Sequence, residues 1–286
     1  MKIFYSPECL KYEQPGHPES PDRVEATAQY LRWNGFELGE PHPCSDQDVL
    51  LAHSADLLES VKAGTFFDFD TPVFQGIDRI AKLSAGAAVD AVMHCLNHGE
   101  KAFSLMRPPG HHAARDRLGG FCYFNSIAIA CLKAMKENAD IRKVAIVDFD
   151  CHHGNGTEDI MLGRKEIYYL SLHQSPLFPG TGLKSRDNCR NIPLLPGTGP
   201  DRFLSVFADE MMAVESFGPD LLAISAGFDA FRLDPMAGLS LEIETFGEIG
   251  RRLSALNKPT FAVLEGGYSK NLPECVNQFL TGLEEK

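Results

Sequence analysis

The stretch VAIVDFDCHHGNGT, residues 144–157, joins a continuous apolar run to a cluster of acidic and imidazole side chains. An apolar run of this length is typical of a strand that is buried on both faces of a parallel sheet. Similar runs are KAFSLMR (101–107), EIYYLSLH (166–173), DLLAISAGFD (220–229) and TFAVLEGGY (260–268). The sequence therefore predicts a buried sheet whose strands end in polar residues.

Segments with helical spacing of apolar residues lie between these runs, at 75–99, 126–139, 201–218 and 242–257. Alternation of strands and helices predicts repeated βα units around a parallel sheet, which is an α/β fold. We find no charge block, repeat or low-complexity linker that would divide the chain. A single domain over residues 1–286 is the expectation.

Composition disfavours several classes of function. The 286 residues carry a net charge of −12, so no surplus of Lys and Arg is available to bind nucleic acid. No apolar run reaches the roughly 20 residues that cross a bilayer. The start, MKIFYSPECLKYEQ, lacks the pattern of a signal peptide. We expect a cytoplasmic protein with no membrane partner, whose eight cysteines form no CxxC pair and are free thiols.

The polar strand ends predict where the chemistry lies, because ligands of parallel sheets bind beyond the carboxyl ends of the strands. If the strand that starts at Val144 continued through residue 152, alternation would place Asp148, Asp150 and His152 on one side. Asp229 ends another strand. A divalent metal explains this concentration of carboxylates, and a mixed set of oxygen and nitrogen ligands suits zinc and also accepts iron(II).

A second pair of histidines lies in MRPPGHHAARDRLGGFCYFN, residues 106–125. His111 and His112 are adjacent between a Pro-Gly turn and a glycine pair. Neighbouring side chains on a loop can reach into one cavity, whereas neighbours on a helix diverge. The pair is therefore a candidate for a chemical role at one cavity.

Further motifs follow in order along the chain. They are HPESPDRV (17–24), HSADLL (53–58), RPPGHHA (107–113), GGFCYFN (119–125), VDFDCHHGNGT (147–157), SLHQSPLFPGTG (171–182), SAGFDAF (225–231) and EGGY (265–268). In this order they resemble the histone deacetylase superfamily, which includes acetylpolyamine amidohydrolases and acetoin-utilisation proteins. Asn155 in HHGNGT is closer to class II and bacterial members. The resemblance implies an arginase-like fold, with about eight parallel strands and helices on both faces.

The resemblance also implies a reaction, the hydrolysis of an acetylated amine to acetate and free amine by a metal-activated water. The implied ligands are Asp150, His152 and Asp229. The implied catalytic residues are the general base His112, its partner His111, the hydrogen-bond acceptor Asp148 and the electrophile Tyr268. Arginases carry extra carboxylates for a second ion where this chain has Gly154 and Phe231, which implies one catalytic ion.

Other family positions imply a substrate tunnel and a route for the product. Phe121, Phe178 and Gly120 would line the tunnel, with Met236 at its mouth, and Arg23 would lie near the exit for acetate. Asn155 would lie behind the ligands. A structural potassium ion is implied at Asp148, Asp150, His152, Ser171 and Leu172.

Alternatives to a lysine deacetylase remain open. An acetylpolyamine amidohydrolase is the first, although Met236 stands where one polyamine-selective branch has glutamate. A catalytically silent binder of acyl-lysine is the second, and the retention of both histidines and Tyr268 argues against it. A metal-free serine hydrolase is disfavoured because the chain has no GxSxG motif. The expected partner is an acetylated amine, and a monomer is the favoured state.

Overall fold

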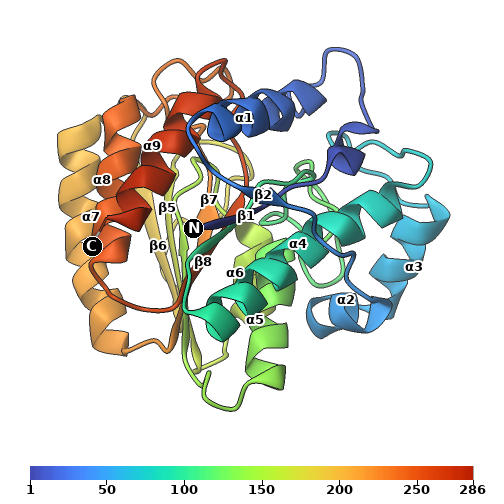
Figure 1. The fold of residues 1–286 in the computed structure, drawn as a ribbon, viewed down its shortest axis with the longest axis horizontal. Helices are drawn as coiled ribbons and strands as arrows, with labels where there is room; N and C mark the ends of the chain where they lie inside the picture. Colours follow the sequence, from blue (N-terminus) through green and yellow to red (C-terminus); the bar gives the residue numbers. More distant parts are fainter. Residues whose placement is uncertain (286) are drawn as a thin grey trace.

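The computed structural model describes residues 1–285. Its centre is an eight-stranded, fully parallel sheet of order β2-β1-β3-β8-β7-β4-β5-β6 (Figure 1). The strands are β1 (Lys2–Phe4), β2 (Leu38–Gly39), β3 (Ala102–Ser104), β4 (Val144–Asp148), β5 (Ile167–Gln174), β6 (Cys189–Leu194), β7 (Leu221–Ala226) and β8 (Thr260–Leu264). The α/β fold that the strand and helix patterns predicted, and the eight strands that the family resemblance implied, are confirmed.

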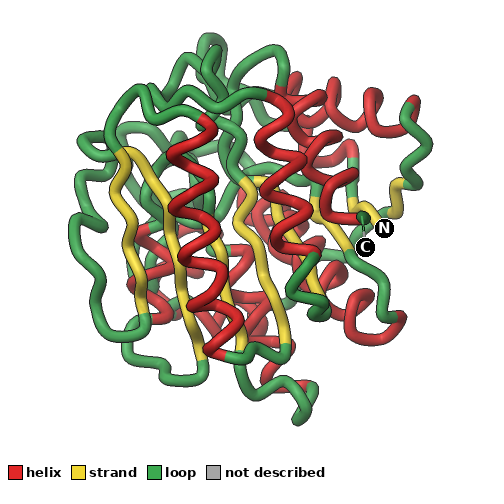
Figure 2. The backbone as a smooth tube through the Cα atoms, turned by 90° about the vertical axis from the view of Figure 1, so that its left-hand side faces the viewer, coloured by secondary structure: helices red, strands yellow, loops and turns green. Residues whose placement is uncertain are grey.

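Helices cover both faces of the sheet, so that the strands lie between two helical layers (Figure 2). Helices α1, α7, α8 and α9 lie on one face, and α2 to α6 lie on the other (Figure 1). The helices are α1 (Pro21–Trp33), α2 (Asp46–Ala52), α3 (Ala55–Ala63), α4 (Ile77–His98), α5 (Ser126–Glu137), α6 (Asn155–Met161), α7 (Pro200–Phe217), α8 (Ile243–Ser254) and α9 (Leu272–Glu284), with a short 3₁₀ turn η1 (Pro7–Leu10).

Burial explains why the central strands were visible in the sequence. Every residue of β4, β7 and β8 is buried, so both faces demand apolar side chains. The edge strand β6 was not predicted, because its sequence CRNIPL alternates between buried and exposed residues and contains a proline. The predicted strands and helices are present, with their ends shifted by a few residues.

The order of the strands determines where the polar strand ends meet. β3, β8, β7 and β4 are consecutive neighbours, and all run in the same direction. The segments that follow them therefore converge at one edge of the sheet. These segments carry the histidine pair, Glu265 with Tyr268, Asp229, and Asp150 with His152.

All eight cysteines are buried and unpaired, which confirms the prediction of free thiols. Within residues 1–285, no helix combines the length and the apolar character that a membrane crossing requires.

Candidate metal centre and tunnel

Asp150, His152 and Asp229 form a buried cluster in which one potential ligand atom from each lies within 4.8 Å of the others. The Nδ1 atom of His152 lies 2.8 Å from Asp229 Oδ2 and 3.2 Å from Asp150 Oδ1. The sequence argument for this convergence was partly wrong. β4 ends at Asp148, so Asp150 and His152 lie on the loop after the strand and not on one face of it.

Backbone donors and missing side chains shape the cluster. The N–H of Gly266 donates to Asp150 Oδ2 at 2.7 Å, and the N–H of Cys151 donates to Asp229 Oδ1 at 2.8 Å. A Cβ at Gly266 would lie 2.4 Å from Asp229 Oδ2, and one at Gly227 would lie 2.1 Å from Asp150 Oδ2. Both glycines are therefore required for the carboxylates to occupy these positions.

The donor set fits a divalent cation. Burial, followed by the charge of Asp150, raises the pKa of Asp229 to about 7, which is the signature of two crowded carboxylates. A cation relieves this repulsion, and two oxygens with one imidazole nitrogen suit zinc or iron(II). These three residues are the cluster that could hold such an ion in the described part of the chain.

His111 and His112, on the loop 107–113, line one cavity together with the candidate ligand His152. The ring centroids of the two loop histidines are 4.0 Å apart. His111 Nδ1 lies 3.1 Å from Asp148 Oδ2. Burial alone would lower the pKa of His111, but the carboxylates of Asp150 and Asp148 outweigh it and raise the pKa to about 10. His111 is therefore the charged member of the pair at neutral pH.

His112 has the opposite electrostatic environment. Burial, and then the positive charges of His111 and His152, lower its pKa well below the ordinary value of 6.5. Its Nδ1 lies 2.8 Å from Asn155 Oδ1, an atom that can only accept. Nδ1 therefore carries the proton, and Nε2 of the neutral ring is free to accept one.

A tunnel of about 400 Å³ reaches this centre. Phe121 and Phe178 form parts of its wall, and Phe178 is 48% exposed. A Cβ at Gly120 would lie 2.6 Å from the His112 ring, so this position needs glycine. The other lining residues are His17, Pro18, Asp70, Pro109, His111, His112, His152, Met236, Gly266 and Tyr268.

Tyr268 lies on the tunnel wall with its ring 5.9 Å from that of Phe121. Its backbone N–H donates to Asp234 Oδ2 at 2.6 Å. Burial raises the pKa of the Tyr268 hydroxyl well above 10, so it stays a donor. Arg23 lies behind it, with its guanidinium 4.6 Å from the centre of the ring and Nε donating to the Gly267 carbonyl at 2.6 Å.

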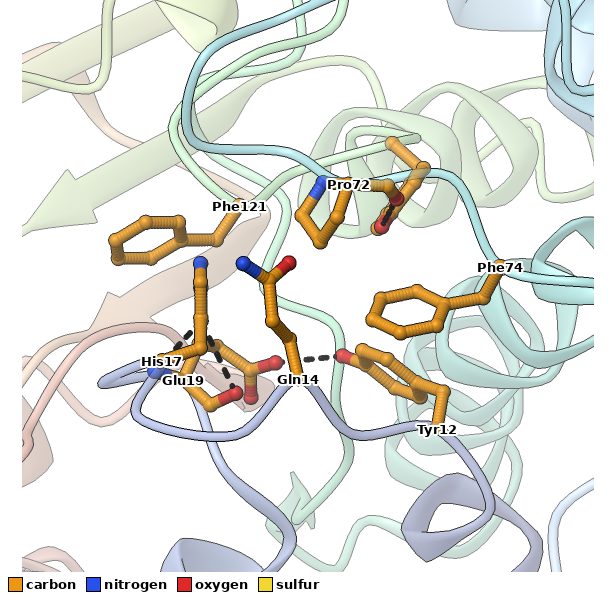
Figure 3. A pocket seen from close by; sticks show the side chains of 8 residues that line it. Tyr12, Gln14, His17, Glu19, Pro72, Phe74 and Phe121 are labelled. Atoms are coloured by element: carbon orange, nitrogen blue, oxygen red, sulfur yellow. Dashed lines mark hydrogen bonds between the residues drawn. The ribbon is translucent and has the colours of Figure 1, made fainter.

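A side pocket of about 10 Å³, room for roughly one water, adjoins the tunnel across His17 and Phe121 (Figure 3). His17 Nε2 lies 3.1 Å from the Asp70 carbonyl, which connects the N-terminal loop to the tunnel mouth. Glu19, also in this pocket, is buried and forms a two-point ion pair with the fully buried Arg107. This wall of the tunnel is thus held by polar contacts.

Several predicted positions lie beside the centre without contacting the tunnel. Ser171 and Leu172 are buried in β5, and Ser171 Oγ lies 2.9 Å from His173 Nδ1. His153 contacts Thr181 and Glu158. The potassium site stays a prediction.

Sequence reasoning missed several residues that build the site. Tyr169 donates its hydroxyl toward Asp148 Oδ2 and the Gly154 carbonyl, each at 3.0 Å. Glu265, the first residue of the EGGY motif, received no role. Tyr169 sits inside an apolar run, so the sequence carried no signal that its hydroxyl would bind Asp148.

The fold and site define an α/β protein with a tunnel that leads to a buried candidate metal centre. Residues 17–283 match the Histone deacetylase domain, and the chain belongs to that family.

Three similar proteins place the chain within it. A "Probable deacetylase" of Archaeoglobus fulgidus is 39% identical over 93% of this chain and 81% of that protein. A "Histone deacetylase-like amidohydrolase" of Pseudomonas aeruginosa is 36% identical over 89% of this chain and 73% of that protein's length. The structure of an acetylpolyamine aminohydrolase from Burkholderia pseudomallei matches with a TM-score of 0.91 and 27% identity, over 99% of this chain and 98% of that one.

Proposed function

We propose that this chain is a zinc-dependent deacetylase that hydrolyses the amide of an acetylated amine, acetyl-lysine or a similar group, to acetate and a free amine. The observation that carries the proposal is the meeting of three groups at one tunnel. They are the buried Asp–His–Asp cluster, a histidine pair with opposite pKa shifts, and a protonated tyrosine. Membership of the Histone deacetylase domain family supports it.

Asp150, His152 and Asp229 would hold the ion. When bound, it supplies Lewis acidity to the substrate carbonyl and to the attacking water. Iron(II) is the alternative ion for the same ligands.

His112 would act as the general base. Its lowered pKa keeps the ring neutral, and the hydrogen bond with Asn155 directs the free Nε2 away from that residue. Nε2 would take the proton of the attacking water and later deliver it to the departing nitrogen. His111, held charged by Asp150 and Asp148, would place its positive charge beside His112 as negative charge develops on the substrate.

Tyr268 would donate its hydroxyl to the carbonyl oxygen as that oxygen becomes negative. Its raised pKa ensures that the proton is present at neutral pH. Arg23 packs on the ring and binds the carbonyls of Gly267 and Glu265, which fixes this wall. We further propose that Arg23 lies near the acetate exit, and that potassium binds at Asp148, Asp150, His152, Ser171 and Leu172.

The lining of the tunnel favours an acylated lysine. Met236 is neutral, and Phe121 and Phe178 give apolar walls that suit an alkyl chain. A second candidate, an acetylpolyamine, is favoured by one observation. Asp70 is the only carboxylate among the lining residues outside the metal cluster, and no Lys or Arg lies among the described ones.

The test is a comparison of kcat/KM for an acetyl-lysine peptide, acetylspermidine, acetylputrescine and longer acyl-lysine peptides, on protein loaded with zinc. We expect the acetyl-lysine peptide to have the highest kcat/KM. The second candidate would be favoured if a polyamine has the highest kcat/KM. Asp70→Asn should then lower that kcat/KM to the value for the acetyl-lysine peptide, and the matched variant Asp68→Asn should not. No turnover on any of them, with zinc bound, would refute the proposal.

A further inference from the structure

A buried carboxylate that the proposed chemistry does not use lies at the end of β8. Glu265 is 0% exposed. Its Oε2 accepts the backbone N–H of Gly110 at 2.7 Å and that of His111 at 3.1 Å. Its Oε1 accepts the hydroxyl of Ser225, on the neighbouring β7, at 3.0 Å. One side chain thus connects two central strands to the histidine loop.

The loop has little freedom apart from this contact. A Cβ at Gly110 would lie 2.6 Å from the Ser126 nitrogen, so the backbone is already packed closely. On the other side, the His111 carbonyl accepts the N–H groups of Gly156 and Thr157, each at 3.0 Å. The peptide units around His111 are therefore held from both sides, by Glu265 and by the start of α6.

We propose that Glu265 is a positioning residue that fixes the backbone of the His111–His112 pair through the hydrogen bonds accepted by Oε2, and not through its charge. The inference rests on the proposed function, because its catalytic readout needs the deacetylase reaction. Placing the base within reach of the attacked group is what the rate depends on, and a displacement of about 1 Å can cost roughly a hundredfold.

The arrangement of the two oxygens separates hydrogen bonding from charge. Both amide donors reach the same oxygen, so the amide oxygen of a glutamine can accept both. Its NH₂ group would then face Ser225 Oγ, which can accept as well as donate. Burial also raises the pKa of Glu265 to about 7, and either protonation state leaves Oε2 an acceptor.

Three variants test the proposal. Glu265→Gln keeps the acceptor, and kcat is expected within about threefold of the original chain. Glu265→Ala leaves two buried N–H groups unpaired, and kcat is expected to fall by about a hundredfold, with KM within about twofold because the tunnel walls are retained. Ser225→Ala is the matched control, since it disturbs the other oxygen and leaves the loop contacts, so its kcat should stay within about twofold.

Hydrogen exchange of the segment 108–113 gives a readout that does not require turnover. Exchange there should accelerate in Glu265→Ala, and stay slow in Glu265→Gln and Ser225→Ala, at equal metal content. An unchanged kcat and unchanged exchange in Glu265→Ala overturn the proposal. A loss in Glu265→Gln as large as in Glu265→Ala overturns it as well, because charge is then the cause. If the original chain turns over no substrate, the proposed function fails, and hydrogen exchange still tests the positioning role.

Discussion

Replacing Asn155 by aspartate tests the assignment of His112 as a neutral base. Asn155 Oδ1 lies 2.8 Å from His112 Nδ1, so Asn155→Asp puts a carboxylate in hydrogen-bond contact with the ring. Two opposite unit charges about 4 Å apart interact by about 4 kcal/mol at an effective dielectric constant of roughly 20. One pKa unit corresponds to about 1.4 kcal/mol, so the upper bound is about three units. Neighbouring charges typically shift a pKa by about one to three units.

The sign follows from the role of the ring. The new carboxylate favours protonated His112 and raises its pKa, and only the neutral ring accepts a proton. The acidic limb of the profile of kcat/KM against pH is therefore expected to move up by about one to three pH units. Asn34→Asp, an equal change of charge at the exposed end of α1, should leave the limb in place. A limb that stays within about 0.3 units in Asn155→Asp, at full metal content, would refute the reasoning.

Three further predictions concern the electrophile, a buried ion pair and acid stability. Tyr268→Phe should lower kcat by about 10²–10³-fold without changing the amount of bound metal. A kcat within about tenfold of the original would show that the hydroxyl does not donate to the reacting carbonyl. Arg107→Met removes the two-point ion pair with the buried Glu19 carboxylate, which keeps only Arg23 as a cationic partner among the residues that the structure describes. It should lower the free energy of unfolding in urea by about 3–5 kcal/mol, and a loss below about 1 kcal/mol, the value of an exposed pair, would contradict the charge argument. Burial lowers the pKa of His53 from 6.5 to about 4. The folded protein therefore binds a proton at His53 less readily than the unfolded chain does. The free energy of unfolding is unaffected by this difference above pH 6.5 and falls by about 3 kcal/mol as the pH drops from 6.5 toward 4. His53→Gln should flatten the fall of unfolding free energy between pH 7 and 4, and an unchanged slope would contradict this.

Much of the fold was predictable because the central strands are buried on both faces. β4, β7 and β8 were visible as apolar runs, and the polar residues just beyond them marked one edge of the sheet. The edge strand β6 and the short β1 and β2 were not located, because their patterns alternate or span too few residues. The number of strands came from the family resemblance.

The site was predictable for residues that chemistry makes conspicuous, and not for those that act through the backbone. Asp150 and His152 were found, but by assuming a strand that in fact ends at Asp148. The hydrogen bond of Tyr169 with Asp148, and the acceptance of two loop amides by Glu265, depend on contacts between distant segments. Local pattern carries no signal for such pairs. The roles of the site residues, the monomeric state, the cytoplasmic location and the extent of the domain stay predictions.

The most direct test of the central claim is a titration of metal-free protein with zinc, in which bound metal and turnover of an acetyl-lysine peptide are measured together. The account predicts no turnover before zinc is added, a rise in proportion to bound zinc, and saturation at one ion per chain, with neither tight binding nor turnover in Asp229→Ala. Full turnover by the metal-free protein, or by Asp229→Ala, would contradict the claim that this cluster holds the catalytic ion.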